Sequence, residues 1–360
     1  MYISVICPNL LVGGAEKMTV NLVNELLNLG YKVDLILLKK DGSFNKELSS
    51  NCNLILLNKK RSRFAFFSLY FYLKKSKSDV LLSTLRETSI LSGLVKRLPF
   101  INQKLVIREA SQFEKRSILY DFFLKVAYES ADLFIANSNF TKKSFDNEIF
   151  KTFRKKIKTV VIGNPVINQN FAENLQEEFE HEWLDNKSLK TIISCGRFDP
   201  IKQFSILIKA FKILYESDKS LRLILIGNGE EYDNLVNLYL SLELKFVVEI
   251  IKFDKTPSRL FKKADLFVSC SKTEGFSNVL VEALGSGVKV LSSNSGGPND
   301  ILNQGEYGKL VKIENEVDLA EKIFCSLGED QDIKKNIKRA YSYSSKSITQ
   351  KYIENINAIL

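Results

Sequence analysis

Two glutamates, Glu274 and Glu282, bracket the segment of the sequence that offers the clearest chemistry. Glu274 follows an apolar run at 266–269 that predicts a buried strand, and a carboxylate in the loop after it can accept hydrogen bonds from sugar hydroxyls. Glu282 falls inside an apolar stretch with helical spacing, where a carboxylate needs a polar partner such as the hydroxyls of a ribose. The alternative is that both are surface charges, as lone glutamates usually are.

The helix expected after this loop begins at Ser277 or Asn278, either of which can act as its N-cap. The free backbone N–H groups of these two residues and of Val279 would face an anion. Gly275 and Phe276 lie directly before the cap. A strand end, a glycine and a helix cap in this order favour a binding loop over a pair of surface charges.

A second segment, GRFDPIK at 196–202, follows the strand-like run at 191–195. Ligands bind at the carboxyl ends of strands in open α/β sheets, and Gly196 permits a close approach there. Arg197 and Lys202 could clamp a diphosphate, one as a fork and the other as a point charge. Lys202 could instead be a solvated lysine, but a cation at the start of a helix opposes its dipole, which favours an anionic partner.

Three glycine-rich turns are weaker signals. Gly13 and Gly14 lie between a strand-like run and a helical pattern, where free N–H groups suit a phosphate or a sugar oxygen; a tight turn explains them equally well. Gly227 follows another strand-like run, but Tyr232 stands where a dinucleotide motif would have its third glycine. The segment SGGPND at 295–300 either shapes the same crevice or forms a structural turn.

Apolar strands alternate with helical patterns in both halves of the chain, which predicts an α/β protein with two parallel sheets, each covered on both faces. We expect domains at 1–165 and 166–344, with 166–190 as a polar, acidic linker and helices in the tail at 333–360. The expected strands are 2–7, 33–38, 80–83, 104–107, 133–136, 159–162, 191–195, 221–226, 246–250, 266–269 and 288–291. Gly30 is placed to end the first helix.

The net charge of +10 is unevenly distributed along the 360 residues. Residues 1–165 contain 27 Lys and Arg against 14 Asp and Glu, whereas 166–360 contain 25 against 28. The first half therefore carries +13 and the second −3, which suggests that the first half faces a polyanion or an anionic membrane. The sequence contains no RNA- or DNA-binding module, so nucleic acid is not the expected partner.

Composition also excludes several kinds of site. The single histidine, His181, rules out a histidine cluster or a Ser/His/Asp triad elsewhere. Five widely spaced cysteines without a CxxC pattern argue against a disulfide framework or a zinc site and fit a reducing compartment. The first residues lack the basic stretch of a secretory signal.

One stretch of the first half combines aromatic and basic residues. Basic clusters at 59–63 and 74–77 flank the run FAFFSLYFYL at 64–73. This pattern is typical of a helix lying at an anionic membrane surface, but a core helix with basic ends is an equal alternative. With 10 residues the run is too short to cross a membrane, which needs about 20.

Taken together, these segments resemble the GT-B glycosyltransferases, most closely family 4 of the retaining enzymes. The resemblance implies two Rossmann-like domains that face each other across a crevice, with the helix at about 345–360 packing back on the first domain. It rests on GGAEKMTVNLVNEL, GRFDPIKQFSILIKAF, LILIGNGEE, EGFSNVLVEALGSG, GGPNDIL and YGKLV, in this order.

The resemblance assigns roles to the residues above. Arg197 and Lys202 would hold the donor diphosphate, Glu274 would lie by the donor sugar, and Glu282 would bind the nucleotide ribose. The catalytic set implied is Glu274, Arg197 and Lys202. The donor-binding set implied is Gly13, Gly14, Gly196, Arg197, Lys202, Gly227, Gly275, Phe276, Ser277, Asn278, Val279 and Glu282.

The sequence departs from the family at one position that matters. Many members have a histidine of the first domain near the donor sugar, and this sequence has none there. Arg108 or Glu109 is the nearest replacement, so these two and Glu16 are expected on the acceptor and sugar side. Ser277 and Asp300, which replace a usual proline and glutamate, are tolerable variants.

The function implied is a retaining hexosyltransferase that needs no metal or other cofactor and moves a sugar from a nucleotide-sugar, most often a UDP-sugar, to a glycan hydroxyl. The acceptor expected is linked to a polyprenyl diphosphate in bacterial surface-polysaccharide synthesis, as for O-antigen or capsule. The protein is then expected to be cytoplasmic and peripheral on the inner face of the membrane. The alternative is a catalytically inactive nucleotide-sugar-binding subunit of a glycosyltransferase complex.

Overall fold

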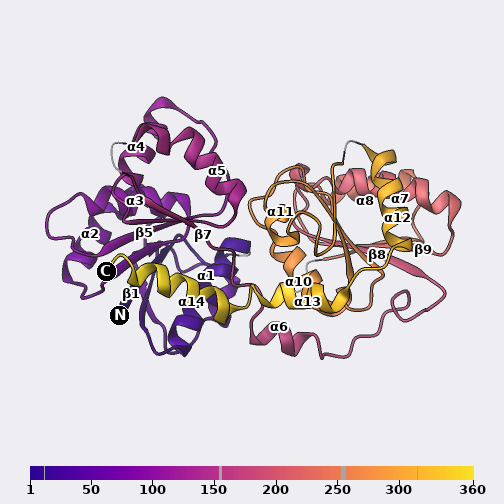
Figure 1. The fold of residues 1–360 in the computed structure, drawn as a ribbon, viewed down its shortest axis with the longest axis horizontal. Coiled ribbons are helices and arrows are strands. Elements are labelled where there is room, and N and C mark those ends of the chain that lie inside the picture. Colours follow the sequence, from indigo (N-terminus) through magenta and orange to yellow (C-terminus); the bar gives the residue numbers. More distant parts are fainter. Residues whose placement is uncertain (12, 154–155, 253–256, 314) are drawn as a thin grey trace. The chain divides into compact units, whose positions relative to one another are not determined.

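The computed structural model describes residues 1–11, 13–153, 156–252, 257–313 and 315–360 (Figure 1). The chain divides into two compact units. Unit 1 comprises Met1–Val166 together with Ser344–Leu360, and unit 2 comprises Ile167–Tyr343. The last helix therefore belongs to the same unit as the N-terminal half of the chain.

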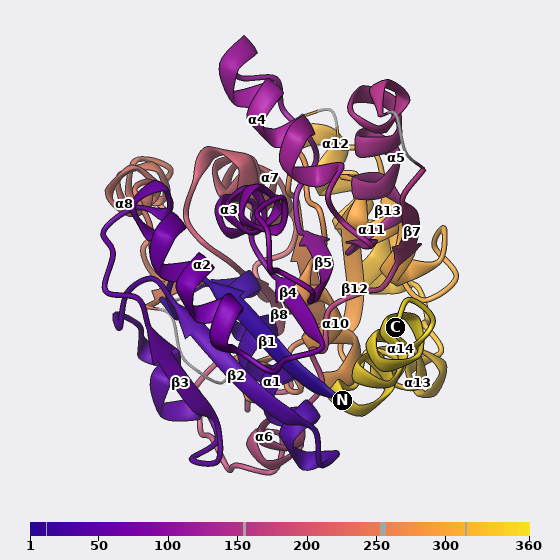
Figure 2. The same cartoon turned by 90° about the vertical axis from the view of Figure 1, so that its left-hand side faces the viewer.

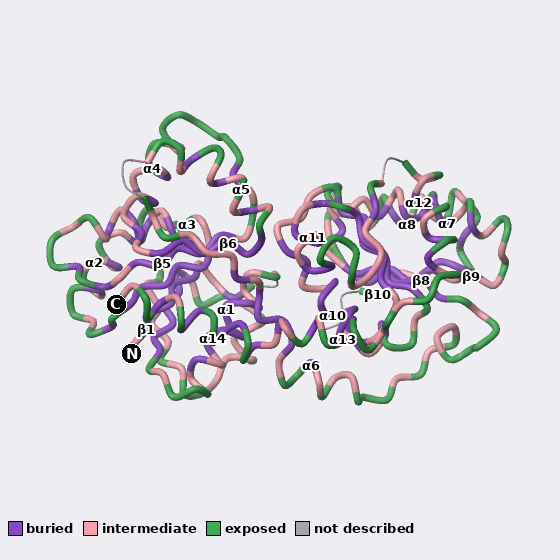
Figure 3. The backbone as a smooth tube through the Cα atoms, in the orientation of Figure 1, coloured by how far each residue is buried: buried purple, intermediate pink, exposed green. Residues whose placement is uncertain are grey.

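The sheet of unit 1 is parallel throughout. Its strands are β1 (Tyr2–Cys7), β2 (Lys32–Leu37), β3 (Asn53–Leu56), β4 (Val80–Ser83), β5 (Lys104–Glu109), β6 (Leu133–Ala136) and β7 (Lys158–Val161). They lie in the order β3-β2-β1-β4-β5-β6-β7, with Ile3 of β1 paired to Val33 on one side and Val80 on the other. The strands form the buried part of the unit (Figure 3) because helices cover both faces.

The helices of unit 1 form two layers. They are α1 (Gly14–Asn28), α2 (Phe66–Lys75), α3 (Arg86–Lys96), α4 (Ile118–Tyr128), α5 (Asn139–Glu148) and α14 (Ser345–Asn357). In one layer α14 packs against α1, and the predicted Gly30, with φ of +82°, lies two residues beyond the end of α1. In the other layer α2, α3, α4 and α5 contribute to one hydrophobic core over the sheet.

A glycine lets α4 lie directly against α3. A Cβ atom at Gly93 of α3 would stand 2.2 Å from the carbonyl oxygen of Ala127 of α4, so no larger residue fits without a backbone shift. Leu124, Ala127 and Tyr128 bury the C-terminal half of α4 in the core. That half of the helix is therefore held firmly in place.

Unit 2 repeats the same architecture. Its strands are β8 (Lys190–Cys195), β9 (Leu221–Ile226), β10 (Val248–Ile251), β11 (Leu266–Ser269), β12 (Lys289–Ser293) and β13 (Lys309–Val311). They form a parallel sheet in the order β10-β9-β8-β11-β12-β13. The helices are α6 (Gln169–Asn174), α7 (Phe204–Ser217), α8 (Tyr232–Ser241), α9 (Ser258–Phe261), α10 (Asn278–Ser286), α11 (Gly297–Leu302), α12 (Glu316–Gly328) and α13 (Ile333–Tyr341).

The predicted strands are all present, and most bounds agree within two residues. The structure adds β3 and β13, two edge strands of 4 and 3 residues that are mostly half-buried. The stretch expected to be a plain linker includes α6, which Asn168 caps through its side chain. The predicted helical tail is confirmed as α13 and α14.

The helix formed by the aromatic run of unit 1 is buried on one face and exposed on the other. Leu69 and Leu73 of α2 are fully buried in the core, whereas Phe67 and Phe71 are 69% and 56% exposed. One face of α2 is thus a core face and the other an apolar surface with basic ends. Among the described residues, none of the helices is both long enough and apolar enough to span a bilayer.

Candidate active site in unit 2

The loops after β8 and β9 are packed tightly together at the carboxyl ends of these strands. Gly196 donates its N–H to the carbonyl of Ile226, and Phe198, which is fully buried, donates to Asn228. A Cβ atom at Gly227 would stand 2.1 Å from the carbonyl oxygen of Gly196, so only glycine permits this approach. Glycine at 227 therefore shapes the loop that presents the exposed Arg197.

Hydrogen bonds to its backbone N–H and carbonyl hold Lys202 in place. The Asp199 carboxylate accepts a hydrogen bond of 3.1 Å from the Lys202 N–H and caps the short 3-10 turn that contains it. The Lys202 carbonyl accepts a hydrogen bond of 3.2 Å from the Cys270 thiol, directly after β11. Burial raises the pKa of this thiol to about 12, so the thiol stays protonated and can donate.

Lys202 and Glu274 form an ion pair. The Lys202 Nζ lies 2.8 and 2.7 Å from the two carboxylate oxygens of Glu274, although the residues are 72 positions apart. The Ser271 hydroxyl donates to the same carboxylate at 3.0 Å. The side chains are 20% and 14% exposed, so the pair is partly shielded but open to a ligand. The structure thus brings together the two predicted charges that belong to different motifs.

The loop of Glu274 is fixed by the loop after β12. Glu274 donates its backbone N–H to Ser295 and accepts from the N–H of Gly297, both at 2.8 Å. A Cβ atom at Gly297 would stand 2.3 Å from the carbonyl oxygen of Gly275, so glycine is required there. The GGPND segment therefore lies against the glutamate loop and supports it.

Helix α10 begins where the sequence predicts, but its cap differs from the prediction. Ser277 occupies the N-cap position with an extended backbone, yet its hydroxyl makes no capping bond. That hydroxyl is buried and has no hydrogen-bond partner among the described residues. Phe276 packs edge-on against Tyr343, whereas Asn278 and Val279 form the half-buried first turn of the helix.

Glu282 lies further along α10 and is only 5% exposed. The residues before and after it, Val281 and Ala283, are fully buried, so Glu282 lies inside the unit rather than at its surface. This contradicts the alternative that Glu282 is a solvated surface charge.

In unit 1 the predicted glycines begin α1. Gly13 is the N-cap residue in extended backbone, and Gly14 is the first residue of the helix. The carboxylate of Glu16 occupies the space next to Gly13, because a Cβ atom there would stand 2.2 Å from a Glu16 carboxylate oxygen. Burial, together with the charge of Glu16, raises the pKa of Cys7 at the end of β1 to about 12.

Arg108 and Glu109 have no face open to a sugar in this structure. Arg108 is fully buried, and its guanidinium donates to the Asn164 side chain at 2.5 Å and to the Thr84 carbonyl at 3.4 Å. Burial lowers the pKa of Arg108, and the phenol of Tyr352 on α14 lies beside it.

Glu109 is 2% exposed. It pairs with Arg86 at 3.0 Å and accepts a hydrogen bond from the Tyr128 hydroxyl. Successive residues of a strand point to opposite faces of the sheet. Arg108 and Glu109 therefore form buried hydrogen bonds and an ion pair on the two sides of β5. The expectation that one of them replaces the missing histidine finds no support in this packing.

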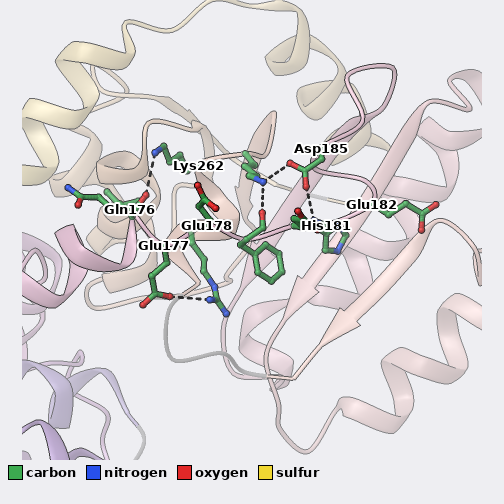
Figure 4. Close-up of a pocket in the computed structure, with 12 residues that line it drawn as sticks. Gln176, Glu177, Glu178, His181, Glu182, Asp185 and Lys262 are labelled. Carbon is green, nitrogen blue, oxygen red and sulfur yellow. Dashed lines mark hydrogen bonds and ion pairs between the residues drawn. The ribbon is translucent and has the colours of Figure 1, made fainter.

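A pocket of unit 2 is lined by charged residues, several of which form ion pairs. It forms where the stretch between α6 and β8 lies over α9 (Figure 4). Arg259 pairs with Glu177 at 3.1 Å, Lys263 pairs with Asp185, and His181 contacts Glu249 at 3.0 Å. These pairs anchor the stretch to the domain. The described residues contain no group of three or more His, Cys, Asp and Glu placed to hold a metal ion.

Each unit matches the profile of a known protein family. The profile of "Glycosyltransferase Family 4" matches residues 12–167, and that of "Glycosyl transferases group 1" matches residues 175–342. The crystal structure of Anabaena Alr3699/HepE in complex with UDP superimposes with a TM-score of 0.80 and 19% identity, covering 99% of this chain and 100% of that one. The chain is a GT-B glycosyltransferase of the family 4 type. The predicted fold class and enzyme class, a hexosyltransferase-type glycosyltransferase, are thereby confirmed.

Curated relatives of this glycosyltransferase include two enzymes of Campylobacter jejuni. The N-acetylgalactosamine-N,N'-diacetylbacillosaminyl-diphospho-undecaprenol 4-alpha-N-acetylgalactosaminyltransferase is 25% identical, covering 93% of this chain and 91% of the relative. The second, which acts on GalNAc-alpha-(1->4)-GalNAc-alpha-(1->3)-diNAcBac-PP-undecaprenol, is 27% identical, covering 94% and 92%. WaaG, a glycosyltransferase involved in lipopolysaccharide biosynthesis, shares the fold with a TM-score of 0.72 at 15% identity, covering 98% of this chain and 99% of that one.

Two supporting groups of the candidate site were not predicted. Ser271 orients the Glu274 carboxylate, and the backbone of Ser295 holds its loop. Ser271 stands two residues beyond the last residue of β11, a position at which ligand-binding side chains are common in parallel sheets. That placement is the signal that could have identified it.

Proposed function

We propose that this glycosyltransferase moves a sugar from a UDP-sugar to a hydroxyl of a glycan carried on a polyprenyl diphosphate, in the synthesis of a bacterial surface polysaccharide such as O-antigen or capsule. The two Campylobacter relatives are named for undecaprenol-linked substrates, and they span most of this chain. HepE has been crystallised with UDP and with UDP-glucose, which favours uridine as the donor base.

The observation that carries the proposal is the contact between Lys202 and Glu274. A donor sugar linked to a diphosphate presents hydroxyls at one end and a double negative charge at the other. The carboxylate suits the hydroxyls, and the ammonium suits the diphosphate. With the donor absent, the two groups neutralise each other, so donor binding exchanges this internal pair for two contacts to the ligand.

The reaction follows from charge development at the leaving group. As the bond between the anomeric carbon and the diphosphate oxygen breaks, negative charge grows on the diphosphate. Arg197, Lys202 and the N–H groups that begin α10 would stabilise it. The acceptor hydroxyl bonds to the anomeric carbon from the same face, and its proton passes to the departing phosphate. The anomeric configuration is then retained.

Charge stabilisation by these side chains supports a reaction that needs no metal ion. Arg197 and Lys202 supply the positive charge that a divalent cation supplies at other phosphate sites. Glu282, buried on α10, would accept hydrogen bonds from the ribose hydroxyls. Gly13 and Gly14 would approach the phosphate and the acceptor from α1, with Glu16 beside them.

A transfer assay tests this function. The protein is incubated with a panel of UDP-, GDP- and ADP-sugars and a polyprenyl-diphosphate-linked glycan in the presence of a chelator, and the product anomer is determined by NMR. Transfer from a UDP-sugar with retained configuration is expected. Transfer that stops with the chelator, or that inverts the configuration, contradicts the proposal.

One observation favours a second candidate, a donor-binding subunit without catalysis. Arg108 and Glu109, which could have replaced the family histidine, are both buried and engaged elsewhere. In that case UDP binds, but no donor sugar is transferred to any acceptor in the same assay.

The proposed site of action is the cytoplasmic face of the membrane, with the protein bound peripherally. A polyprenyl-linked acceptor lies at the bilayer surface. The +13 charge of residues 1–165 favours anionic lipid there, and the exposed aromatic face of α2 is one contact surface.

A further inference from the structure

We propose that Gln203 is a positioning residue for Lys202: its left-handed backbone holds the Lys202 ammonium within reach of Glu274 and thereby sets the affinity for the donor diphosphate. This role rests on the proposed function, since it concerns the same diphosphate site. The side chain of Gln203 makes no hydrogen bond with another described residue, so its contribution comes from the backbone.

The backbone of Gln203 adopts a conformation that residues other than glycine rarely take. Its φ and ψ are 54° and 34°, in the left-handed region, where a Cβ atom crowds the following carbonyl oxygen. The start of a helix does not require this conformation, because α5 and α14 begin from the extended residues Ser138 and Ser344. A strained residue persists only where its surroundings hold it, and such residues cluster at functional sites.

The segment that contains Gln203 runs between two fixed elements. Strand β8 pairs with β9 and β11 inside the sheet of unit 2, and Phe198, which follows the strand, is fully buried. Helix α7 lies between α8 and α12 in one layer over this sheet (Figure 2), with Leu207 and Ile208 fully buried in the core. The chain must therefore pass from the strand to the helix within residues 199–203.

Gln203 completes this passage by reversing the chain in one residue. Its N–H donates to the Pro200 carbonyl at 3.3 Å, which ends the 3-10 turn directly after Lys202. Its carbonyl then accepts the first hydrogen bonds of α7, from Ile206 at 3.1 Å and from Leu207 at 3.3 Å. One residue thus separates the turn that carries the lysine from the helix that enters the core.

The same turn is held from its other side by the chain that follows β11. Lys272 donates its N–H to the Ile201 carbonyl at 2.8 Å. The Cys270 thiol lies 3.2 and 3.4 Å from the carbonyl oxygens of Lys202 and Gln203. The left-handed residue therefore aligns three successive carbonyls with the segment that leads to the partner carboxylate of the lysine.

In this alignment the Lys202 side chain runs past Gly196 to Glu274. A Cβ atom at Gly196 would stand 3.8 Å from both the Cδ and the Cε atoms of Lys202, so the stem of the lysine lies against the loop after β8. Its ammonium then lies 2.8 and 2.7 Å from the two carboxylate oxygens. An extended or right-handed Gln203 would turn the lysine away from these contacts. A diphosphate would then bind more weakly, because it would have to order a free side chain.

Titration calorimetry of UDP with the full chain tests this role through the backbone preference at position 203. Q203V introduces a β-branched residue, which the left-handed region disfavours most, and UDP should bind about tenfold more weakly than to wild type. Q203T repeats the test if Q203V does not fold. Q203G adopts the conformation freely and should retain the wild-type affinity.

The matched control is E243V. Glu243 is also left-handed, with φ of 60°, but it lies between α8 and the start of β10. The substitution introduces the same backbone strain at the edge of the sheet opposite the strand ends. E243V should therefore lower the melting temperature and leave the affinity for UDP unchanged.

A double-mutant cycle separates positioning from general packing. In the K202A background, Q203V should cause no further loss of UDP affinity, because Gln203 acts through the lysine. An equal loss with and without Lys202 overturns the proposal, as does unchanged affinity in Q203V and Q203T or weakened binding in Q203G. A wild type that binds no UDP would instead contradict the proposed function, so the two failures are distinguishable.

Discussion

The two units share one architecture and use their charges in opposite ways. In unit 2 the ion pair of Lys202 and Glu274 lies at the strand ends with its side chains 20% and 14% exposed. In unit 1 the pair of Arg86 and Glu109 lies at the end of β5 with its side chains 13% and 2% exposed, and the Tyr128 hydroxyl also donates a hydrogen bond to the Glu109 carboxylate. An accessible pair can exchange partners with a ligand, whereas a sealed pair can only hold the fold together.

The comparison teaches that a charge at a strand end is not by itself a functional charge. Both pairs join segments distant in sequence, and both contain a glutamate that the sequence analysis assigned to sugar binding. Exposure separates them. We therefore expect substitution in unit 1 to cost stability and substitution in unit 2 to cost activity.

The largest expected effect is on the sealed pair of unit 1. The substitution Arg86→Ala leaves Glu109 buried without its cation, and breaking a buried pair in this way costs about 3–5 kcal/mol. Denaturant unfolding measures the change. The matched control is Lys142→Ala, which removes a partly exposed pair with Asp146 and should cost less than about 1 kcal/mol. Equal losses in the two variants would remove the distinction between sealed and surface pairs.

The next effect is on the open pair of unit 2. Glu274→Gln keeps the size of the side chain but removes its charge, and we expect the rate of sugar transfer to fall by about 10²-fold or more, in the range seen for single electrostatic groups. The melting temperature should stay close to that of wild type. Glu321→Gln, an exposed position on α12, is the control. A large loss of stability in Glu274→Gln would place Glu274 with Glu109 as a structural residue.

The packing of Gly297 against the loop of Glu274 allows a test of whether the position of this carboxylate matters for activity. Gly297→Ala places a methyl group 2.3 Å from the Gly275 carbonyl oxygen. The loop must therefore shift, at a cost of about 1–3 kcal/mol in the free energy of unfolding. Transfer activity should fall with it, because Glu274 moves. Gly328→Ala has open space around the added carbon and should change neither property. Full activity in Gly297→Ala would show that the position of this loop does not matter.

The smallest expected effects concern the buried cysteine thiols, which both units have. Burial, joined at Cys7 by the charge of Glu16, raises the pKa of both Cys7 and Cys270 to about 12. Unfolded thiols ionise near pH 8.5, so above that pH the unfolded state loses protons that the folded state keeps, and stability falls as pH rises. Between the pKa of the unfolded thiol and that of the folded thiol, each cysteine lowers the free energy of unfolding by up to about 1.4 kcal/mol per pH unit.

Alanine at either cysteine should therefore flatten the alkaline decline of the unfolding free energy. Denaturant titrations at several pH values between 8 and 11 measure the slope. An unchanged slope in both Cys7→Ala and Cys270→Ala would mean that these thiols ionise as easily in the folded protein as in the unfolded chain.

Most strands of the fold, and the motifs that contribute Lys202 and Glu274 to the candidate site, could be predicted from the sequence. Central strands such as β1 and β9 were predicted with their exact bounds because parallel strands buried on both faces are continuous apolar runs. The edge strands β3 and β13, of 4 and 3 residues, were not predicted, whereas the edge strands β7 and β10 were. Short edge strands lack the continuous apolar runs that identify buried central strands.

The candidate site combines local and long-range information. Motifs singled out Lys202 and Glu274, but no local pattern could show that they touch each other across 72 residues. Sequence did not indicate that Arg108 and Glu109 are buried at a strand end, because their burial depends on contacts with Asn164, Tyr352 and Tyr128.

The most direct test of the donor site in unit 2 is titration calorimetry of UDP in the presence of a chelator, for wild type, Lys202→Ala and the control Lys209→Ala, an exposed lysine of α7. A diphosphate site at Lys202 predicts that wild type and Lys209→Ala bind UDP equally and that Lys202→Ala binds at least about tenfold more weakly, which corresponds to about 1.4 kcal/mol. Equal affinity in Lys202→Ala, or no binding of UDP to the wild type, would contradict it.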